Sequence, residues 1–163
     1  MRALVIGAPG LVGKALVHSL DARGADVLGT YRSRPADGMV ALDVADASEV
    51  QSVVQSYQPT VVFLTAALTA VDYCEDHREE AWRVNVHGPA TVARESAQVG
   101  AKLVFYSTEY VFDGLDGPYG EKDPLHPLGA YAQSKAAGEK AIQTALDDAL
   151  ILRTTVVFGW DPT

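Results

Sequence analysis

The first thirteen residues, Met1-Arg2-Ala3-Leu4-Val5-Ile6-Gly7-Ala8-Pro9-Gly10-Leu11-Val12-Gly13, join a short apolar run to three evenly spaced glycines. An amphipathic stretch follows at residues 11–22. The apolar run therefore predicts a strand, the glycines a tight turn, and the stretch after them a helix. A strand, a turn and a helix in this order are typical of the first unit of a parallel sheet with crossover helices.

The remaining sequence repeats this alternation of short apolar runs and longer helical stretches. Strands are predicted at residues 3–6, 26–30, 39–42, 60–64, 102–106 and 150–153, and helices at residues 11–22, 48–56, 79–98 and 130–146. Gly88-Pro89 marks a kink or a restart inside the third helix, because proline has no amide hydrogen to donate. We therefore predict an α/β fold, a Rossmann-type doubly wound parallel sheet with helices on both faces.

Composition limits the class of protein. With 163 residues, of which 48% are hydrophobic, the chain is long enough for one ordinary core, and residues 1–163 are expected to form one domain. Its apolar runs fall far short of the roughly 20 residues of a membrane helix, and no signal peptide is recognised. Cys74 is the only cysteine, and the net charge of −8 argues against a nucleic-acid surface. A cytoplasmic protein with neither nucleic acid nor membrane as partner is expected, with Trp82 and Trp160 partly buried.

The glycine turn has a chemical interpretation. Glycines between a strand and a helix allow the backbone to approach a pyrophosphate at the helix N-terminus. The spacing is G-x-x-G-x-x-G rather than G-x-G-x-x-G, and three glycines also occur in plain strand-to-helix turns. The cofactor contacts predicted here are Gly7, Pro9, Gly10, Leu11, Val12 and Gly13.

The segment after the second predicted strand bears on cofactor choice. An NAD-specific domain is expected to place a carboxylate against the ribose 2′-hydroxyl at this point. This chain has Tyr31-Arg32-Ser33-Arg34 instead, and guanidinium groups suit a 2′-phosphate. NADP(H) is therefore favoured, while NAD(H) and a simple pair of surface arginines stay open. Asp43 and Val44 end the third strand, where they are expected to reach the adenine, unless Asp43 only caps a helix.

Tyr131 and Lys135 are four residues apart at the start of a predicted helix, so their side chains share one face. A lysine ammonium beside a phenol lowers the phenol pKa from about 10 and makes tyrosine a usable proton donor. Ser107 and Thr108 follow the fifth predicted strand, at the sheet edge where ligands of open α/β sheets bind. A hydroxyl there is expected to hold a substrate carbonyl oxygen beside Tyr131.

These motifs together resemble the extended short-chain dehydrogenase/reductases, and within them the dTDP-4-dehydrorhamnose reductase branch. The similarity runs in order along nearly the whole chain. It rests on Gly7-Ala8-Pro9-Gly10-Leu11-Val12-Gly13, Ala66-Ala67-Leu68-Thr69-Ala70-Val71-Asp72, Asn85-Val86, Ser107-Thr108-Glu109-Tyr110-Val111-Phe112-Asp113-Gly114, and Tyr131-Ala132-Gln133-Ser134-Lys135 with Gly138-Glu139.

The resemblance implies roles for individual residues. Tyr131 would be the general acid, and Lys135 would lower its pKa and bind the nicotinamide ribose. Thr108 would hold the 4-keto oxygen, with Ser107 as fallback, and Asn85 would support a proton relay near Lys135. Thr65, Ala66 and Ala67 would line the cofactor. Thr65 and Glu109 depart from the asparagine and aspartate common in relatives, and neither removes a catalytic group.

The resemblance implies an NADPH-dependent reductase of a nucleotide-linked 4-keto-6-deoxy sugar, present here as its cofactor-binding portion. The C-terminal substrate region of such enzymes is expected to be absent from this chain. Two alternatives stay open: a sugar-nucleotide epimerase or dehydratase, and a non-catalytic NADP-binding regulatory subunit similar to the methionine adenosyltransferase β subunit. No metal site is expected, because Cys74, Glu75, Asp76 and His77 are adjacent rather than spaced for one ion. Association into a homo-oligomer is left open.

Overall fold

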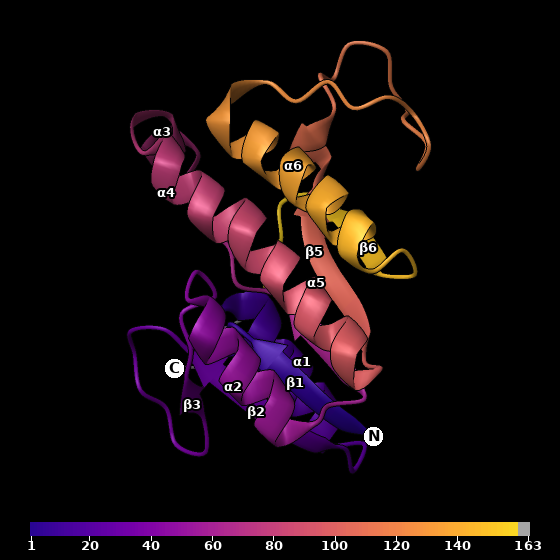
Figure 1. The fold of residues 1–163 in the computed structure, drawn as a ribbon. Coiled ribbons are helices and arrows are strands. Elements are labelled where there is room, and N and C mark those ends of the chain that lie inside the picture. Colours follow the sequence, from indigo (N-terminus) through magenta and orange to yellow (C-terminus); the bar gives the residue numbers. More distant parts are fainter. Residues whose placement is uncertain (160–163) are drawn as a thin grey trace.

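A six-stranded parallel sheet forms the centre of the computed structural model, with the strand order β3-β2-β1-β4-β5-β6 (Figure 1). The structure describes residues 1–159, and Trp160 lies outside the described residues. All six predicted strands are confirmed within two residues at either end: β1 (Arg2–Ile6), β2 (Asp26–Tyr31), β3 (Val40–Ala41), β4 (Val61–Leu64), β5 (Lys102–Thr108) and β6 (Leu150–Thr154).

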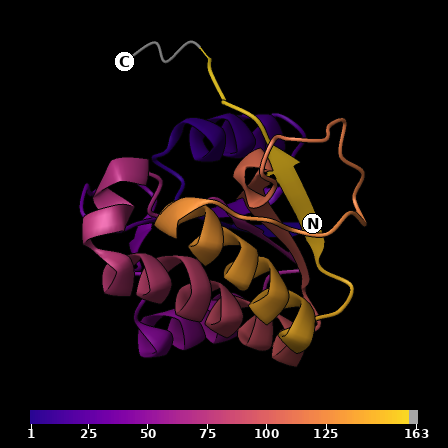
Figure 2. The ribbon, with the colours of Figure 1, turned by 90° about the horizontal axis from the view of Figure 1, so that it is seen from above.

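Helices cover both faces of this sheet, as predicted (Figure 2). They are α1 (Leu11–Asp21), α2 (Ala47–Tyr57), α3 (Val71–Asp76), α4 (Arg78–Trp82), α5 (Gly88–Val99) and α6 (Gly129–Ala145). Helix α1 lies on one face, and α2, α5 and α6 lie on the other. Within residues 1–159, no helix has both the length and the apolar character needed to cross a membrane.

Strand β1 shows why the sheet is buried on both sides. Its residues Ala3 and Val5 pack in the cluster that includes Leu20 of α1. Its residues Leu4 and Ile6 pack in the larger cluster that includes residues of α2, α5 and α6. All four are at most 1% exposed. Because side chains alternate along a strand, an apolar run without alternation is what two covered faces require.

The predicted helix at residues 79–98 is interrupted, and the predicted restart at Gly88-Pro89 is confirmed, because α5 begins at Gly88. The break precedes Gly88-Pro89: residues Arg83–His87 form a π-helical turn, η1, in which Gly88 N donates to Arg83 O. Pro89 has no amide hydrogen for the carbonyl of Asn85, so the regular pattern fails one turn earlier. That carbonyl lies so close to α6 that a Cβ on Gly138 would meet it at 2.2 Å. The wide turn and the glycine together allow α6 to approach η1.

Two short elements were not predicted. Helix α3 has six residues and begins after Ala70, which provides no side-chain cap. A 3₁₀ turn, η2 (Glu109–Val111), follows β5, and the hydroxyl of Thr108 accepts a hydrogen bond from Tyr110 N there. Elements this short carry too few residues for a period to be recognised. Residues 113–127 form a long segment without helix or strand.

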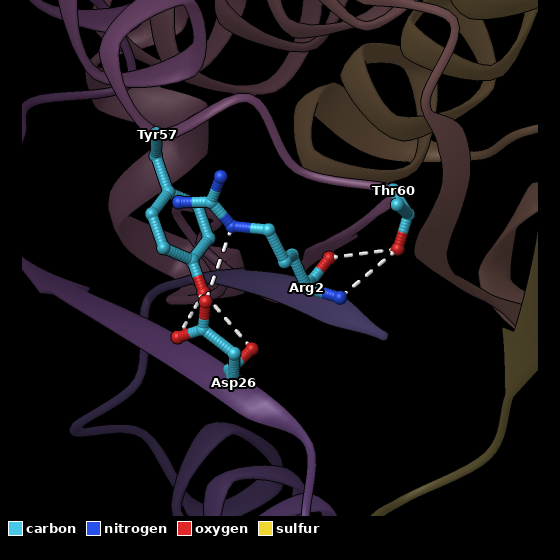
Figure 3. A network of polar contacts seen from close by, with 4 residues as sticks. All are labelled: Arg2, Asp26, Tyr57 and Thr60. Atoms are coloured by element: carbon cyan, nitrogen blue, oxygen red, sulfur yellow. Dashed lines mark hydrogen bonds and ion pairs between the residues drawn. The ribbon is translucent and has the colours of Figure 1, made fainter.

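A polar network ties β1, β2 and α2 together at the amino ends of the strands (Figure 3). Arg2 Nε donates to Asp26 Oδ2 at 3.1 Å, and the guanidinium lies 4.6 Å from the centre of the Tyr57 ring. The Tyr57 hydroxyl donates to the Asp26 carbonyl at 2.9 Å, and Arg2 N donates to Thr60 Oγ1 at 3.1 Å. The Arg2 and Asp26 side chains are 47% and 59% exposed, so the ion pair contributes at most about 1 kcal/mol. The network is structural and lies away from the cavity described next.

Candidate active site

The carboxyl ends of β1, β4, β5 and β6 border a cavity of about 630 Å³. This is the edge of an open α/β sheet at which ligands bind. The sequence-predicted site residues that line it are Gly7, Gly10, Leu11, Val12, Gly13, Thr65, Ala66, Ala67, Ser107, Thr108, Tyr131 and Lys135. The fold therefore brings the glycine turn and the Tyr131-Lys135 pair to one cavity, although they are more than 100 residues apart in the sequence.

Each of the three glycines is suited to its position for a different structural reason. Gly7 has φ +93°, and a Cβ there would meet Ala66 N at 2.7 Å. A Cβ on Gly13 would meet Gly7 O at 2.4 Å, so α1 starts in direct contact with the turn. A Cβ on Gly10 would meet only Gly7 O, at 3.3 Å. The Gly10 backbone is therefore the part of the turn that a ligand can approach closely.

The start of α1 provides groups that bind an anion. Helix α1 begins at Leu11, and its N-cap Gly10 has no side chain to accept the first amide hydrogens. Leu11, Val12 and Gly13 all line the cavity. Free amide hydrogens and the positive end of the helix dipole favour a phosphate at this point. Thr65 stabilises the turn from the other side, because its hydroxyl lies 2.9 Å from Ile6 O and 3.1 Å from Gly7 O.

Lys135 is almost completely buried, with 2% of its surface exposed. Its Nζ donates to Tyr106 O at 2.6 Å and lies 4.1 Å from the centre of the Phe105 ring. Burial lowers the pKa of Lys135 to about 7, and the charge of Glu139 acts against that lowering. Lys135 is thus close to the balance between its charged and neutral forms at neutral pH.

The pKa of Tyr131 moves in the opposite direction from the prediction. Burial of the phenol raises its pKa, a hydrogen bond with Thr108 lowers it, and the charge of Glu109 raises it further. The lysine ammonium donates to a main-chain carbonyl of β5 instead. The phenol is therefore held protonated, which is the form that donates a proton.

Ser107 and Thr108 differ in their hydrogen bonds. Thr108 Oγ1 lies 3.0 Å from Glu109 Oε2 and accepts from Tyr110 N at 3.2 Å. Ser107 is 5% exposed, and its hydroxyl oxygen has no hydrogen-bond partner within the described part of the chain. A buried hydroxyl without a partner is costly, so Ser107 offers a donor and an acceptor to a ligand in the cavity.

Asn85 lies behind the cavity and is 1% exposed. Its amide nitrogen donates to Leu68 O at 2.9 Å and to Ser134 Oγ at 3.0 Å, and its amide oxygen accepts from Leu68 N at 2.9 Å. The side chain thus connects η1 to the segment after β4 and to α6. The structure gives Asn85 a positioning contact with the helix of Tyr131 and Lys135.

Within residues 1–159, seven predicted cofactor contacts do not line this cavity. They are Pro9, Tyr31, Arg32, Ser33, Arg34, Asp43 and Val44. Arg32, Ser33 and Arg34 are exposed on the loop after β2. The Asp43 carboxylate accepts from Ala45 N at 2.9 Å, while Asp46 is the residue that caps α2. Val44 is 5% exposed and packs in the larger apolar cluster.

The acidic cluster after Ala70 has a structural role. The Glu75 carboxylate accepts from Ala130 N at 2.5 Å, and Leu128, the N-cap of α6, has no side-chain bond of its own there. Cys74 is buried, and the His77 ring stacks on Tyr73 with centroids 3.7 Å apart. No group of three His, Cys, Asp or Glu side chains within residues 1–159 is arranged to hold a metal ion. Glu75 thus caps the helix that carries Tyr131.

Replacing Glu75 with Ala is expected to destabilise the protein by about 1 kcal/mol, because the first turn of α6 loses its acceptor. Urea denaturation measures the loss, and hydrogen exchange of the Ala130 amide locates it. Glu75→Gln keeps an acceptor oxygen and should retain most of the protection. Asp76→Ala removes the same charge from an exposed neighbour and serves as control. Equal exchange in Glu75→Ala and Asp76→Ala would show that the cap is not formed.

Sequence patterns missed several residues of the site. Tyr106, Glu109, Tyr110 and Thr154 line the cavity, and Glu139, four residues after Lys135, is a buried carboxylate that pairs with the partly exposed Arg153. One signal was present: Glu139 follows Lys135 by four residues, a helical spacing that places both on one face. No pattern indicated Glu75, whose partner is 55 residues away.

Comparison with known proteins gives consistent matches. The family model described as RmlD substrate binding domain matches residues 1–163. Methionine adenosyltransferase 2 subunit beta of Danio rerio is 39% identical over 97% of this chain and 48% of its own length. A dTDP-4-dehydrorhamnose reductase of Streptomyces griseus is 41% identical over 97% of this chain and 50% of its own length.

A solved structure agrees with the fold. The crystal structure of dTDP-4-dehydrorhamnose reductase from Bacillus anthracis in complex with NADP has a TM-score of 0.84 and 36% identity, and covers 94% of this chain and 53% of that one. The chain thus spans about half the length of the curated relatives that it matches.

Proposed function

The chain belongs to the RmlD substrate binding domain family, and on this basis we propose that it is the NADPH-binding portion of a reductase acting on a nucleotide-linked 4-keto-6-deoxy sugar. One observation carries the proposal: the anion-binding start of α1 and the residues Thr108, Tyr131 and Lys135 border a single cavity. A site for a dinucleotide and a site for proton transfer are thereby adjacent, which is the arrangement that carbonyl reduction requires.

The residues of the cavity fit the cofactor. The open backbone at Gly10 and the amides of α1 suit the pyrophosphate, and Lys135 suits the hydroxyls of the nicotinamide ribose. Arg32 and Arg34 are exposed on the loop after β2, where they would meet a 2′-phosphate. NADP(H) is therefore favoured, and NAD(H) remains the second choice. When bound, the cofactor supplies the hydride.

The chain's own residues supply the proton and the positioning. Tyr131, held in its protonated form by burial, would donate its proton to the carbonyl oxygen as that oxygen becomes negative. The Thr108 hydroxyl would hold this oxygen, with the unpartnered Ser107 hydroxyl as a second donor. Lys135 would orient the ribose and compensate the phenolate that remains. Asn85 would keep α6 and the segment after β4 in place.

We expect the chain to bind NADPH at least about tenfold more tightly than NADH, since charged hydrogen bonds to a phosphate contribute more than 1.4 kcal/mol. Calorimetric titration of each cofactor measures the difference. The double substitution Arg32→Ala with Arg34→Ala should remove the preference by weakening NADPH binding alone. Arg23→Ala, an exposed arginine after α1, is the matched control. Equal affinities in the unsubstituted chain would disprove the role of the two arginines.

A second candidate is a non-catalytic NADP-binding subunit, which is supported by the 39% identity to the methionine adenosyltransferase subunit. Thr108, Tyr131 and Lys135 favour catalysis, since a pure binding site has no use for a partly buried proton donor. An epimerase or dehydratase is a further alternative, and the arginines after β2 argue against it because such enzymes usually retain NAD.

The cellular setting also belongs to the proposal. We infer a cytoplasmic protein whose partner is a small nucleotide sugar, without nucleic acid or membrane, and with residues 1–163 as one domain. The net charge of −8 and the lone Cys74 support this inference. Homo-oligomer formation is to be tested by light scattering.

A further inference from the structure

A buried carboxylate lies one helical turn beyond Lys135. Glu139 is on α6, four residues after Lys135, and each is 2% exposed. A carboxylate removed from water is costly unless other groups compensate its charge. Residues four apart on a helix share a face, so the charge of Glu139 lies on the same side of α6 as the Lys135 ammonium.

Arg153 of β6 compensates part of that charge. Its Nε donates to both oxygens of Glu139, at 3.1 and 3.2 Å, and its Nη2 donates to Oε2 at 2.7 Å. These contacts fix the carboxylate in one orientation, because a guanidinium offers its donors in a rigid plane. Glu139 is therefore bound by a permanent cation on β6 and shares a helix face with a titratable cation, Lys135.

Arg153 is itself held by the segment that follows β5. Its Nη1 donates to Glu121 O at 3.2 Å, and its guanidinium lies 5.1 Å from the centre of the Phe112 ring. Phe112 stacks on Tyr119, with ring centroids 4.4 Å apart. The long loop of residues 113–127 thus contributes to the position of the ion pair, and through it to the surroundings of Lys135.

We propose that Glu139, oriented by Arg153, is a positioning residue that keeps the Lys135 ammonium charged at its buried site beside Tyr131. The catalytic role of this charge rests on the proposed function, in which Lys135 orients the nicotinamide ribose and compensates the negative charge of the Tyr131 phenolate. The charge relation itself concerns only groups within this chain, so it is testable without substrate or cofactor.

The surroundings of Lys135 support the assignment to Glu139. Titratable groups also occur on the other elements packed against α6, among them Glu95 on α5, His87 on η1, Glu79 on α4, Glu75 on α3, Tyr106 on β5 and Glu109 on η2. Glu139 is the group whose charge opposes the lowering of the Lys135 pKa by burial. Glu109 and Cys74 act instead on the pKa of Tyr131.

The test uses the lysine signal directly. The chain has five lysines, Lys14, Lys102, Lys122, Lys135 and Lys140, so ¹³C-labelled lysine gives few signals, and that of Lys135 is the one missing in a Lys135→Met variant. The unsubstituted protein should show a Lys135 pKa of about 7. In Glu139→Gln this pKa should fall by about one pH unit or more, because an opposite charge on the same buried face of α6 is lost.

Matched variants separate charge from structure. Glu139→Asp restores a carboxylate and should bring the Lys135 pKa back toward the unsubstituted value. Glu121→Gln removes the same charge from an exposed side chain whose carbonyl, not its carboxylate, binds Arg153, so the Lys135 pKa should not move. If Glu139→Gln does not fold, Glu139→Gln with Arg153→Gln removes both charges of the pair and should also lower the pKa of Lys135.

A Lys135 pKa that is equal or higher in the folded Glu139→Gln protein overturns the proposal, as does an ordinary lysine pKa near 10.4 in the unsubstituted protein. Neither result depends on turnover. If the lysine titrates as expected but the protein reduces no keto sugar, only the proposed function fails.

Discussion

Replacing Tyr131 with Phe is expected to lower the rate of keto-sugar reduction by about 10²–10⁴-fold, the range typical of a lost general acid. The structure gives the physical reason. Burial raises the pKa of the Tyr131 phenol, so the group is protonated and ready to donate, and phenylalanine keeps its shape without its proton. NADPH affinity should stay nearly unchanged, because the start of α1 and Lys135 are untouched.

The measurement follows NADPH absorbance with a nucleotide-linked 4-keto-6-deoxy sugar, and calorimetry follows NADPH binding. The assay should use the full protein, because this chain spans about half the length of the curated relatives that it matches. Tyr57→Phe makes the same chemical change in the network at the amino ends of the strands and should leave turnover unaffected. Unchanged turnover in Tyr131→Phe would refute the role assigned to the phenol. NADPH binding with no turnover even before substitution would favour the non-catalytic subunit.

Replacing Gly138 with Ala is expected to destabilise the protein by about 2 kcal/mol. The new Cβ would lie 2.2 Å from Asn85 O, a main-chain atom of η1, so either α6 or η1 has to move. In an exposed helix interior the same substitution stabilises the protein by up to about 1 kcal/mol, because alanine has the higher helix propensity. A loss of stability in Gly138→Ala would therefore show that the contact with Asn85 O outweighs the gain in helix propensity.

Urea denaturation measures this effect. Gly120→Ala is the control, because a Cβ there meets its nearest neighbour, Asp123 Oδ2, at 3.6 Å, and its stability should hardly change. We also expect Gly138→Ala to weaken NADPH binding, since Lys135 and Tyr131 move with α6. A Gly138→Ala protein as stable as the unsubstituted one would contradict the close approach of α6 and η1.

The predictable part of the fold came from local patterns. Short, mostly apolar runs of four or five residues located all six strands, and the central strands lack polar alternation because both of their faces are covered. The long helices were predicted from amphipathic spacing, which is also a local pattern. Within residues 79–98, Gly88-Pro89 correctly indicated a restart, since α5 begins at Gly88, but no pattern indicated the π-helical turn before it. That turn contains Asn85, whose carbonyl would otherwise accept the amide hydrogen that Pro89 lacks.

The candidate site was predictable where chemistry depends on spacing along the chain. The glycine turn and the Tyr131-Lys135 pair were found that way, and both line the cavity. The direction of the Tyr131 pKa was predicted wrongly. A four-residue spacing shows that two side chains share a face, but not how deeply they are buried or that Lys135 donates to Tyr106 O. Burial decides this pKa, and burial is a property of the packed structure.

The sequence alone determined a parallel α/β sheet, a glycine turn before α1 and the residue types suited to carbonyl reduction, because these follow from period, spacing and side-chain chemistry. Only the tertiary structure decided which residues support them. Glu75 caps α6 from 55 residues away, and Arg153 binds Glu139 from a neighbouring strand. Such contacts depend on how helices and strands pack in three dimensions, and local patterns in a sequence carry no information about those distances.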